Sequence, residues 1–373
     1  MTGSLDILAY AGNEDVRLLA EAAEGFAKRR LKVEAMRRPD RGVDRELWAE
    51  FASMGWFSIA VPEADGGFGM GPDALAAVMP PLGARLVREP VAASAIPVAR
   101  LLSRSPRGAL RDKLLGALMA GELVPCVVWG AEGEALSFAS VASRDGIRIT
   151  GTASYLIPGE PADGYLLPVL GDGESALFWL AADQVGIASR QETRADGGSV
   201  LHLEIDAEIS PAALLSAGGD VAGMLEDARD WALLATSAEL LGLVRETLDR
   251  TKDYLKTRKQ FGKTIGSFQA LQHRMADLYL QQELAASVLD HVLAEIAARP
   301  VPSVLARGAS RAKARAATAA QRVTREAIQL HGGIGFTDEH EIGLFLKRAL
   351  VLTAWLGNAN VQARRFGEQV RNG

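Results

Sequence analysis

Two segments in the second half of the chain carry residue types that suit a large, flat, anionic ligand. The first spans residues 254–279 (YLKTRKQFGKTIGSFQALQHRMADLY), and the second spans residues 329–337 (QLHGGIGFT). The chemically informative side chains of the first segment lie on or beside a helical stretch that a glycine turn interrupts: Arg258, Phe261, Gln269 and His273. The guanidinium of Arg258 stays charged and presents forked donors that match phosphate oxygens.

The second segment offers an amide and a flexible turn. Gln329 precedes Gly332 and Gly333, and a glycine backbone can approach a ligand closely. Each feature also has a simpler interpretation: Arg258 as a solvated arginine, and Gly332–Gly333 as an ordinary cap at the end of a helix. The presence of both segments in one chain favours a ligand site.

The composition restricts the class of protein. The 373 residues predict two or three packed units, with 48% hydrophobic and 23% charged residues. A formal charge of -5 argues against a general nucleic-acid binder. The single cysteine, Cys126, excludes a disulfide framework and a cysteine-based metal cluster, and no metal site is expected. The N-terminus lacks a signal-peptide pattern, and no stretch reaches the roughly 18 apolar residues of a membrane span, so a cytoplasmic protein is expected.

Residues 1–120 are expected to form an N-terminal α-helical domain. Apolar residues recur at helical spacing over 13–54, and further helices are expected over 74–86, with Asp73 as N-cap, and 107–120. A glycine-rich loop (55–75) separates them. This loop lacks the Lys-Ser or Lys-Thr ending of a phosphate-binding P-loop and is interpreted as a turn between helices.

The pattern changes after Gly121 to short apolar runs bounded by Gly, Asp or Pro, which are typical of strands. These runs are LVPCVVW (123–129), GIRIT (146–150), GYLLPVL (164–170), SALFWL (175–180) and SVLHLEI (199–205). They predict a small β-sheet or β-barrel domain over 121–215. Helix-length patterns do not separate the runs, which disfavours a doubly wound dinucleotide-binding sheet.

Helical periodicity returns and continues to the end of the chain. Long segments over 221–256, 267–298, 303–331 and 338–368 predict a C-terminal four-helix bundle over 220–373. The expected fold class is therefore α+β and multidomain, with helices first, a small β domain in the centre and the bundle last.

These segments carry a family resemblance. RKQFGKTIGSFQALQHRMADLY, QLHGGIGFT and the earlier GWFSIAVPEADGGFG (55–69) resemble the acyl-CoA dehydrogenase family of flavoproteins, and the α, β, α order matches along essentially the whole chain. The resemblance implies α,β-dehydrogenation of an acyl-CoA thioester, with electrons passed to an electron-transfer flavoprotein. It also implies a homotetramer, or dimer of dimers, with FAD at a subunit interface. The residues that it implies for FAD are Arg258, Gln260 and Phe261 toward a neighbouring subunit, Gln269 nearby, and Gln329, Gly332 and Gly333 along the pyrophosphate and adenosine.

The catalytic base of the family is missing from both of its usual positions. In one arrangement the base is a Glu before a Gly in the last helical region, where this chain has Leu356 before Gly357. In the other it lies 26 residues before the motif arginine, which is Ala232 here. Asp230 is a candidate replacement, although two residues along a helix rotate a side chain by roughly 200°, and an exposed or Arg229-paired acid is the preferred interpretation.

The other acids in these regions have structural interpretations. Glu239 is expected to pair with a basic residue of the bundle, and Asp338, Glu339 and Glu341 are expected to be capping charges before the last helix.

The β block departs from the family pattern too. The usual Thr-Glu-Pro and Gly-Ser-Asp elements are replaced by VVWGAEGEALSFASV (127–141), and a Trp-Ile-Thr-Asn-like segment is replaced by residues 155–158. Trp129 and Tyr155 are candidates for the wall of a flavin pocket, and buried core aromatics are the preferred alternative.

Three functional hypotheses follow. The chain is an active acyl-CoA dehydrogenase with a displaced base, acting on a bulky or branched acyl-CoA. Alternatively it is a catalytically silent, FAD-supporting subunit of a heterotetramer with a related subunit, as in family members that act on steroid side chains. The third is a non-enzymatic helical assembly protein, against which both ligand-like segments count. A flavin monooxygenase of the same fold also needs no carboxylate base, but the sequence does not point to an oxygenase substrate.

Overall fold

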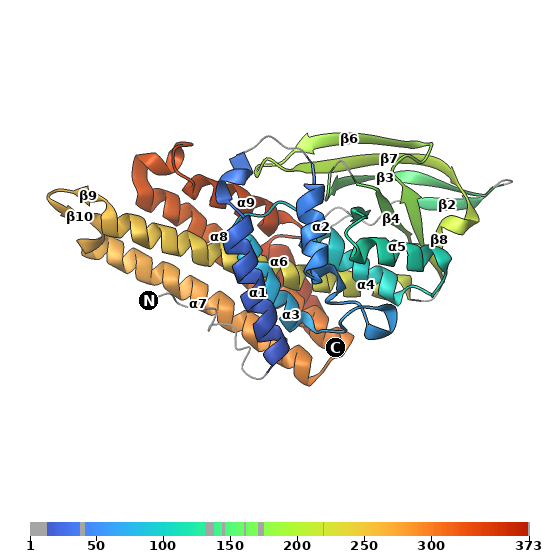
Figure 1. Cartoon of the computed structure of the whole chain (residues 1–373), viewed down its shortest axis with the longest axis horizontal. Coiled ribbons are helices and arrows are strands. Elements are labelled where there is room, and N and C mark those ends of the chain that lie inside the picture. The colour runs from blue at the N-terminus through green and yellow to red at the C-terminus, as the bar shows by residue number, and fades with distance from the viewer. Residues whose placement is uncertain are drawn as a thin grey trace. The chain divides into compact units, whose positions relative to one another are not determined.

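A computed structural model describes residues 13–37, 42–130, 138–143, 146–159, 162–170, 175–218 and 220–371. The chain folds into two compact units. The helical unit comprises Met1–Arg38, Gly71–Val87 and Leu233–Gly373, and the sheet unit comprises Pro39–Met70 and Arg88–Ala232. The expected order of N-terminal helices, a small central β block and C-terminal helices is confirmed (Figure 1). The domain boundaries near 120 and 215 stay a prediction.

Long helices dominate the helical unit (Figure 1). Its elements are α1 (Glu14–Arg30), the 3-10 helix Val33–Arg37, α3 (Pro72–Ala84), the second part of α6 (Val221–Thr257), α7 (Gln269–Ala298), α8 (Pro302–His331), α9 (Ile342–Ala354) and α10 (Ala359–Arg371). The helix α8 contacts α7, α9 and α10. Its buried positions include many alanines, such as Ala309, Ala312, Ala316 and Ala320, which allow neighbouring helices to pack closely.

Two glycines let α3 and α6 touch at the backbone. A Cβ atom at Gly83 would lie 1.9 Å from the carbonyl oxygen of Glu239, and one at Gly242 would lie 1.9 Å from that of Pro80. Any larger residue at either glycine would push the two helices apart. The N-cap of α3 is Gly71, so the expectation for Asp73 is wrong: it lies in the first helical turn.

The last expected helical segment is broken in two. The helix α9 ends at Ala354 and α10 begins at Ala359. Between them, Leu356 and Gly357 adopt left-handed backbone angles, with φ of 53° and 98°. The Asn358 side chain accepts hydrogen bonds from the N–H groups of Asn360 and Val361 and so caps α10. By length and composition Ile342–Arg371 is the one membrane-span candidate among the described residues, but the break divides it.

The sheet unit contains two four-stranded sheets. One has the order β1 (Pro125–Val127), β4 (Gly164–Val169), β5 (Ala176–Ala181), β8 (Leu214–Ala217), with β1 and β4 parallel. The other has the order β2 (Ala139–Ala142), β3 (Ile147–Leu156), β7 (Ser199–Ile209), β6 (Ile187–Thr193) and is antiparallel. Apolar side chains of both sheets form one core, including Phe138, Ile149, Leu167, Phe178 and Leu203. The β block is thus a pair of packed sheets.

Helices α2 (Arg45–Ser53), α4 (Ile96–Arg104) and α5 (Ala109–Met119) belong to the sheet unit. An ion pair fixes the glycine-rich loop there, because Arg111 donates to both carboxylate oxygens of Asp65, at 3.1 and 2.6 Å. The Arg111 guanidinium holds the pKa of Asp65 below its usual value. This loop therefore has a structural anchor, in line with its interpretation as a turn between helices.

Candidate functional site

The first ligand-like segment forms a tight hairpin between α6 and α7 (Figure 1). Its strands are β9 (Lys259–Gln260) and β10 (Lys263–Thr264), and Gln260 pairs with Lys263. Phe261 and Gly262 are therefore the two loop residues, with φ of 53° and 78°. Such loops normally use Asn, Asp or Gly, because a left-handed backbone costs other residues roughly 1–2 kcal/mol. A phenylalanine held there points to a role outside folding.

The hairpin presents an aromatic and cationic surface. The Phe261 side chain is 90% exposed, and its ring meets that of Phe268 edge-on at 6.3 Å. The Lys263 ammonium lies 4.2 Å from the centre of the Phe268 ring. Arg258 is exposed, while its carbonyl oxygen accepts a hydrogen bond from the N–H of Ile265. The other polar residues predicted for this segment are exposed as well: Gln260, Gln269 and His273.

The second segment turns at the end of α8. The Gly332 N–H donates to the carbonyls of Gln329 and Ile328, and Gly332 has φ of 68°, so the alternative interpretation as a helix cap is confirmed. Capping does not require Gly333. A Cβ atom at either glycine would meet no described atom within 4 Å, which leaves this backbone open to a ligand. Gln329 is exposed beside it.

Tyr254 joins the two segments. Its hydroxyl donates to the backbone carbonyl of His331 at 3.1 Å, and the two rings stack with centroids 4.3 Å apart at 22°. Tyr254 lies one helical turn before Arg258, and His331 directly precedes Gly332. The structure therefore brings together the end of α6 and the glycine turn.

Sequence reasoning missed an open cleft of about 590 Å³ in the helical unit. It is lined by α8 and the start of α10: Thr318, Gln321, Arg322, Arg325, Glu326, Asn358, Ala359 and Asn360. Arg322 and Arg325 are exposed, and no ion pair joins either of them to another described residue. Two arginines three residues apart on a helix share one face. This spacing in the sequence could have indicated a cationic surface on α8.

The expected base position before Gly357 is a well-supported turn. Leu356 is half-buried, and its carbonyl accepts a hydrogen bond from the Gln362 side chain at 2.5 Å. The fully buried Lys313 donates from Nζ to the carbonyls of Thr353, Trp355 and Gly357 at 3.4, 2.9 and 3.2 Å. The turn is thus held in place without a carboxylate.

Asp230 and Ala232 lie in the part of α6 that belongs to the sheet unit. Asp230 is only 2% exposed, so the expectation of an exposed acid is wrong. Arg229 instead donates to Glu226 at 2.7 Å. Ala232 is fully buried. A catalytic role for Asp230 stays a prediction.

Two further expectations concern acids of the helical unit. Glu239 accepts a hydrogen bond from Arg348 at 2.6 Å, both side chains being buried, which confirms a partner within the bundle. Glu341 is the N-cap residue of α9 but makes no side-chain capping bond, and it pairs with Arg250 instead. Glu341 therefore lies at the N-terminus of α9, as expected for a capping charge, but without a capping hydrogen bond.

The aromatic candidates of the sheet unit differ from each other. Trp129 is 6% exposed, as a core residue should be, and its indole N–H has no partner among the described residues. Tyr155 is 66% exposed and packs edge-on against His202, so the expectation of a core position is wrong. Residues 131–137 of the altered segment lie outside the described residues.

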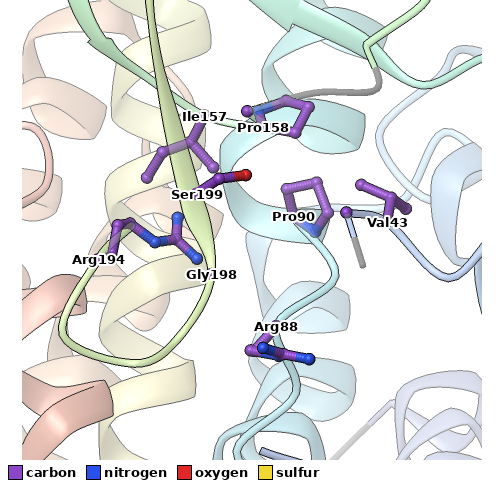
Figure 2. A pocket seen from close by; sticks show the side chains of 10 residues that line it. Val43, Arg88, Pro90, Ile157, Pro158, Arg194, Gly198 and Ser199 are labelled. Atoms are coloured by element: carbon purple, nitrogen blue, oxygen red, sulfur yellow. The ribbon is translucent and has the colours of Figure 1, made fainter. Parts of the chain in front are cut away.

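A small cavity lies beside the replaced segment 155–158 (Figure 2). It measures about 20 Å³, which is room for roughly one water molecule. Arg88 donates to the carbonyl of Gly197, and Arg194 donates to Asp196, so both arginines brace the turn between β6 and β7. The cavity is too small for an organic ligand.

Comparison with known proteins places these features in a family. The model of the acyl-CoA dehydrogenase N-terminal domain matches residues 13–122, and that of the C-terminal domain matches residues 226–370. The acyl-CoA dehydrogenase FadE27 of Mycobacterium tuberculosis is 31% identical over 332 residues, which cover 88% of each chain.

Solved structures agree over almost the whole length. A chain of the ChsE4-ChsE5 complex from Mycobacterium tuberculosis is 30% identical with a TM-score of 0.85, over 96% of this chain and 98% of that one. A chain of the Tcur3481-Tcur3483 steroid ACAD variant is 26% identical with a TM-score of 0.83, over the same shares. The matched domains and the relatives of nearly full length show that this chain belongs to the acyl-CoA dehydrogenase family of FAD-dependent flavoproteins.

Proposed function

We propose that this chain is an FAD-binding subunit of an acyl-CoA dehydrogenase that forms the α,β double bond of an acyl-CoA thioester, and that a related subunit supplies the carboxylate base. The observation that carries the proposal is the Leu356–Gly357 turn. Its left-handed geometry and its support by Lys313 are present, but its side chain is apolar. A leucine cannot accept the α-proton.

The helical unit has surfaces that fit FAD. The ring of Phe261 offers a flat apolar face, and Arg258 offers a forked cation to the pyrophosphate. The open backbone at Gly332 and Gly333 allows close approach of the adenosine part, with Gln329 as an amide donor or acceptor and Gln260 and Gln269 near the hairpin. The cleft arginines, Arg322 and Arg325, add positive charge for a second contact with a phosphate.

Proton removal limits what this chain does by itself. When bound, FAD supplies the acceptor for the β-hydrogen as hydride, and the electrons then pass to an electron-transfer flavoprotein. The α-proton must go to a base within about 2.6–3.2 Å, directly or through one water. Leu356 and Ala232, at the two usual positions, have no proton-accepting atom. The contribution of this chain is therefore to bind and orient FAD and acyl-CoA.

The comparisons support a heteromeric assembly. The ChsE4-ChsE5 structure is a complex of two differently named chains, and the Tcur3481-Tcur3483 structure is described as a steroid ACAD. By analogy, a bulky acyl group such as a steroid side chain is the proposed substrate class. The helix α7 also exposes an apolar stripe that a related subunit would cover, formed by Tyr279, Leu280 and Leu284, each more than half exposed.

A second candidate function is an enzyme that acts alone, as a homotetramer, with Asp230 as the base. The observation in its favour is the burial of Asp230, because a buried carboxylate close to a reacting carbon is suited to proton abstraction. Replacing Asp230 with Asn keeps its size and removes the basic oxygen. Under this alternative, Asp230→Asn abolishes activity of the chain purified alone.

The decisive experiment is expression of the chain alone and together with a related subunit that carries the Glu-Gly motif. Flavin content is measured first, and bleaching of the flavin by a panel of acyl-CoAs, including steroid side-chain thioesters, is measured next. We expect flavin in the chain alone with no bleaching, and bleaching by the pair. A Glu→Gln variant of the related subunit should silence the pair.

Other outcomes identify the rival functions. Bleaching by the chain alone that Asp230→Asn removes would replace the proposal with the self-sufficient enzyme. A colourless protein in both preparations, even after incubation with FAD, would leave a helical assembly protein as the function.

A further inference from the structure

The glycine turn rests on a stack of rings contributed by distant parts of the helical unit, with the buried His331 between the half-buried Tyr254 and His340. The imidazole of His331 is sandwiched against Tyr254, at 4.3 Å, and its centroid lies 4.6 Å from that of His340. His331 is 3% exposed. The Tyr254 hydroxyl also holds the His331 carbonyl, so the ring and backbone next to Gly332 are both fixed by one tyrosine.

The hydrogen bonds of His331 identify the tautomer of its neutral ring. Its Nδ1 lies 2.7 Å from the carbonyl oxygen of Ala327, and a carbonyl only accepts, so Nδ1 carries the hydrogen. In the neutral ring Nε2 is then bare. This Nε2 is buried and has no partner among the described residues. A second proton would therefore place an unpaired positive charge in the stack.

Titratable and charged groups of both signs surround the stack, and among them His340 opposes protonation of His331. The helix α6 contributes Arg250, the segment before α9 contributes His340 and Glu341, and the first 3-10 helix contributes Arg37 and Glu34. Burial is the largest influence on the pKa of His331 and lowers it; the hydrogen bond to Ala327 acts in the opposite direction, and His340 lowers the pKa further. Burial, Arg250 and Arg37 lower the pKa of His340.

The acids nearby are engaged with each other and with Arg250. Burial and the hydrogen bond with Glu34 raise the pKa of Glu341, while Glu341 also forms an ion pair with Arg250. The Glu34 carboxylate has a lowered pKa, first because of its own backbone hydrogen bond and then because of Glu341. Among the described residues, neither of these two carboxylates is bonded to His331.

We propose that Tyr254 and His331 act as a clamp that holds the Gly332–Gly333 turn in its cofactor-binding geometry only while the His331 imidazole is neutral. His331 is thus a positioning residue, and the inference rests on the proposed role of the turn in FAD binding. Acidification would release the turn, because a protonated ring leaves the stack for water. The FAD affinity of this chain would then decrease as the pH falls, while the backbone pairing of the hairpin stays intact.

The sign of the effect follows from the direction of the shift. A ring whose pKa is below 6.5 in the clamped state protonates more readily once released. The clamped state is therefore unaffected well above pH 6.5 and loses stability as pH falls below it. The equilibrium constant for release of the clamp rises by up to about tenfold for each pH unit of acidification, until the clamped ring itself gains a proton.

The test measures the dissociation constant for FAD, by quenching of flavin fluorescence, from about pH 5 to about pH 8. The wild type is compared with His331→Asn, which retains a donor for Ala327 but does not titrate. His291→Asn is the matched control, because His291 lies on α7 with a side chain 65% exposed. Thermal unfolding of the FAD-free protein is recorded over the same range.

We expect the affinity of the wild type and of His291→Asn to fall below pH 6.5, and that of His331→Asn to stay level. His340→Asn should reduce the loss of affinity in acid and move it to lower pH, because it removes a neighbour that opposes protonation of the clamped ring. A level wild-type profile, or an unchanged slope in His331→Asn, would overturn the clamp.

The remaining outcomes are also decisive. If the wild type binds no FAD at any pH, the proposed function fails, and the clamp is judged by the unfolding midpoints of the FAD-free proteins. A fall of the wild-type midpoint below pH 6.5 that is absent from His331→Asn supports the clamp. Identical midpoint profiles of the two proteins overturn it. If His331→Asn does not fold, the pH profile of His340→Asn decides: a transition displaced from that of the wild type supports the clamp, and an unchanged transition overturns it.

Discussion

Under the proposed function, replacing Leu356 with Glu should give this chain the ability to dehydrogenate by itself. The backbone requires no change, because Leu356 already has the left-handed φ of 53° and the turn is held by Lys313 and Gln362. The change therefore adds a carboxylate to a preformed turn at the position where the family carries its base. Leu356→Gln is the matched control, with the same shape and no basic oxygen.

Two magnitudes follow from the site. A positioned general base contributes about 10²- to 10⁴-fold to the rate of proton transfer, so flavin reduction by Leu356→Glu should exceed that of Leu356→Gln by this factor. The stability cost should be modest. Leu356 is half-buried, so the replacement forfeits about half the burial energy of a leucine, which is about 1 kcal/mol.

The assay is anaerobic mixing of the FAD-loaded variants with excess acyl-CoA, with flavin absorbance followed over time. Equal rates for the Glu and Gln variants, with equal flavin content, would refute the assignment of this turn as the base position. A pH profile adds a second check, because the rate of Leu356→Glu should rise as its carboxyl group loses its proton.

Three further predictions concern stability and cofactor affinity. Glu239→Gln should lower the free energy of unfolding by about 3–5 kcal/mol in urea denaturation, because it removes the carboxylate that is paired with the buried Arg348 guanidinium; a loss below 1 kcal/mol would contradict this. Phe261→Asn should stabilise the FAD-free hairpin by about 1 kcal/mol, since Asn tolerates the left-handed loop, yet weaken FAD binding in titrations; unchanged affinity would remove the ring from the cofactor site. The Asp65–Arg111 ion pair should stabilise the folded protein fully above pH 3.8, and this stabilisation should be lost as pH falls toward the lowered pKa of Asp65. The free energy of unfolding of Asp65→Asn, measured over the same acid range, should therefore lack this pH-dependent decrease.

Local patterns explain why so much of the fold could be predicted. Helical periodicity and short apolar runs are properties of neighbouring residues, and they located the long helices and five of the strands. Exposed strands were missed for the same reason: β6 (Ile187–Thr193) has hardly any buried side chains and therefore no apolar run. The break after α9 did have a local signal, since a glycine followed by asparagine ends one helix and caps the next.

The candidate site depended on contacts between distant residues. Arg258 and Gly333 were found because their motifs are local, but the Tyr254–His331 bond that joins the two segments spans 77 residues. Burial of Asp230 was equally hidden, because the helix on which it lies is covered on most sides and periodicity gives no exposed face. An acid in such a helix looks exposed by its type alone.

Lys313 explains why the turn between α9 and α10 does not depend on the side chain at position 356. Its ammonium group is fully buried and needs the carbonyls of Thr353, Trp355 and Gly357, since an unpaired buried charge would cost several kcal/mol. These acceptors are backbone atoms, so the turn between α9 and α10 is enforced whatever side chain stands at position 356. Stability therefore preserves the geometry of the turn, and the proposed function, in which a related subunit provides the carboxylate, requires no change of fold. The turn is thus a property of the fold, and the chemistry depends on the single side chain that it presents.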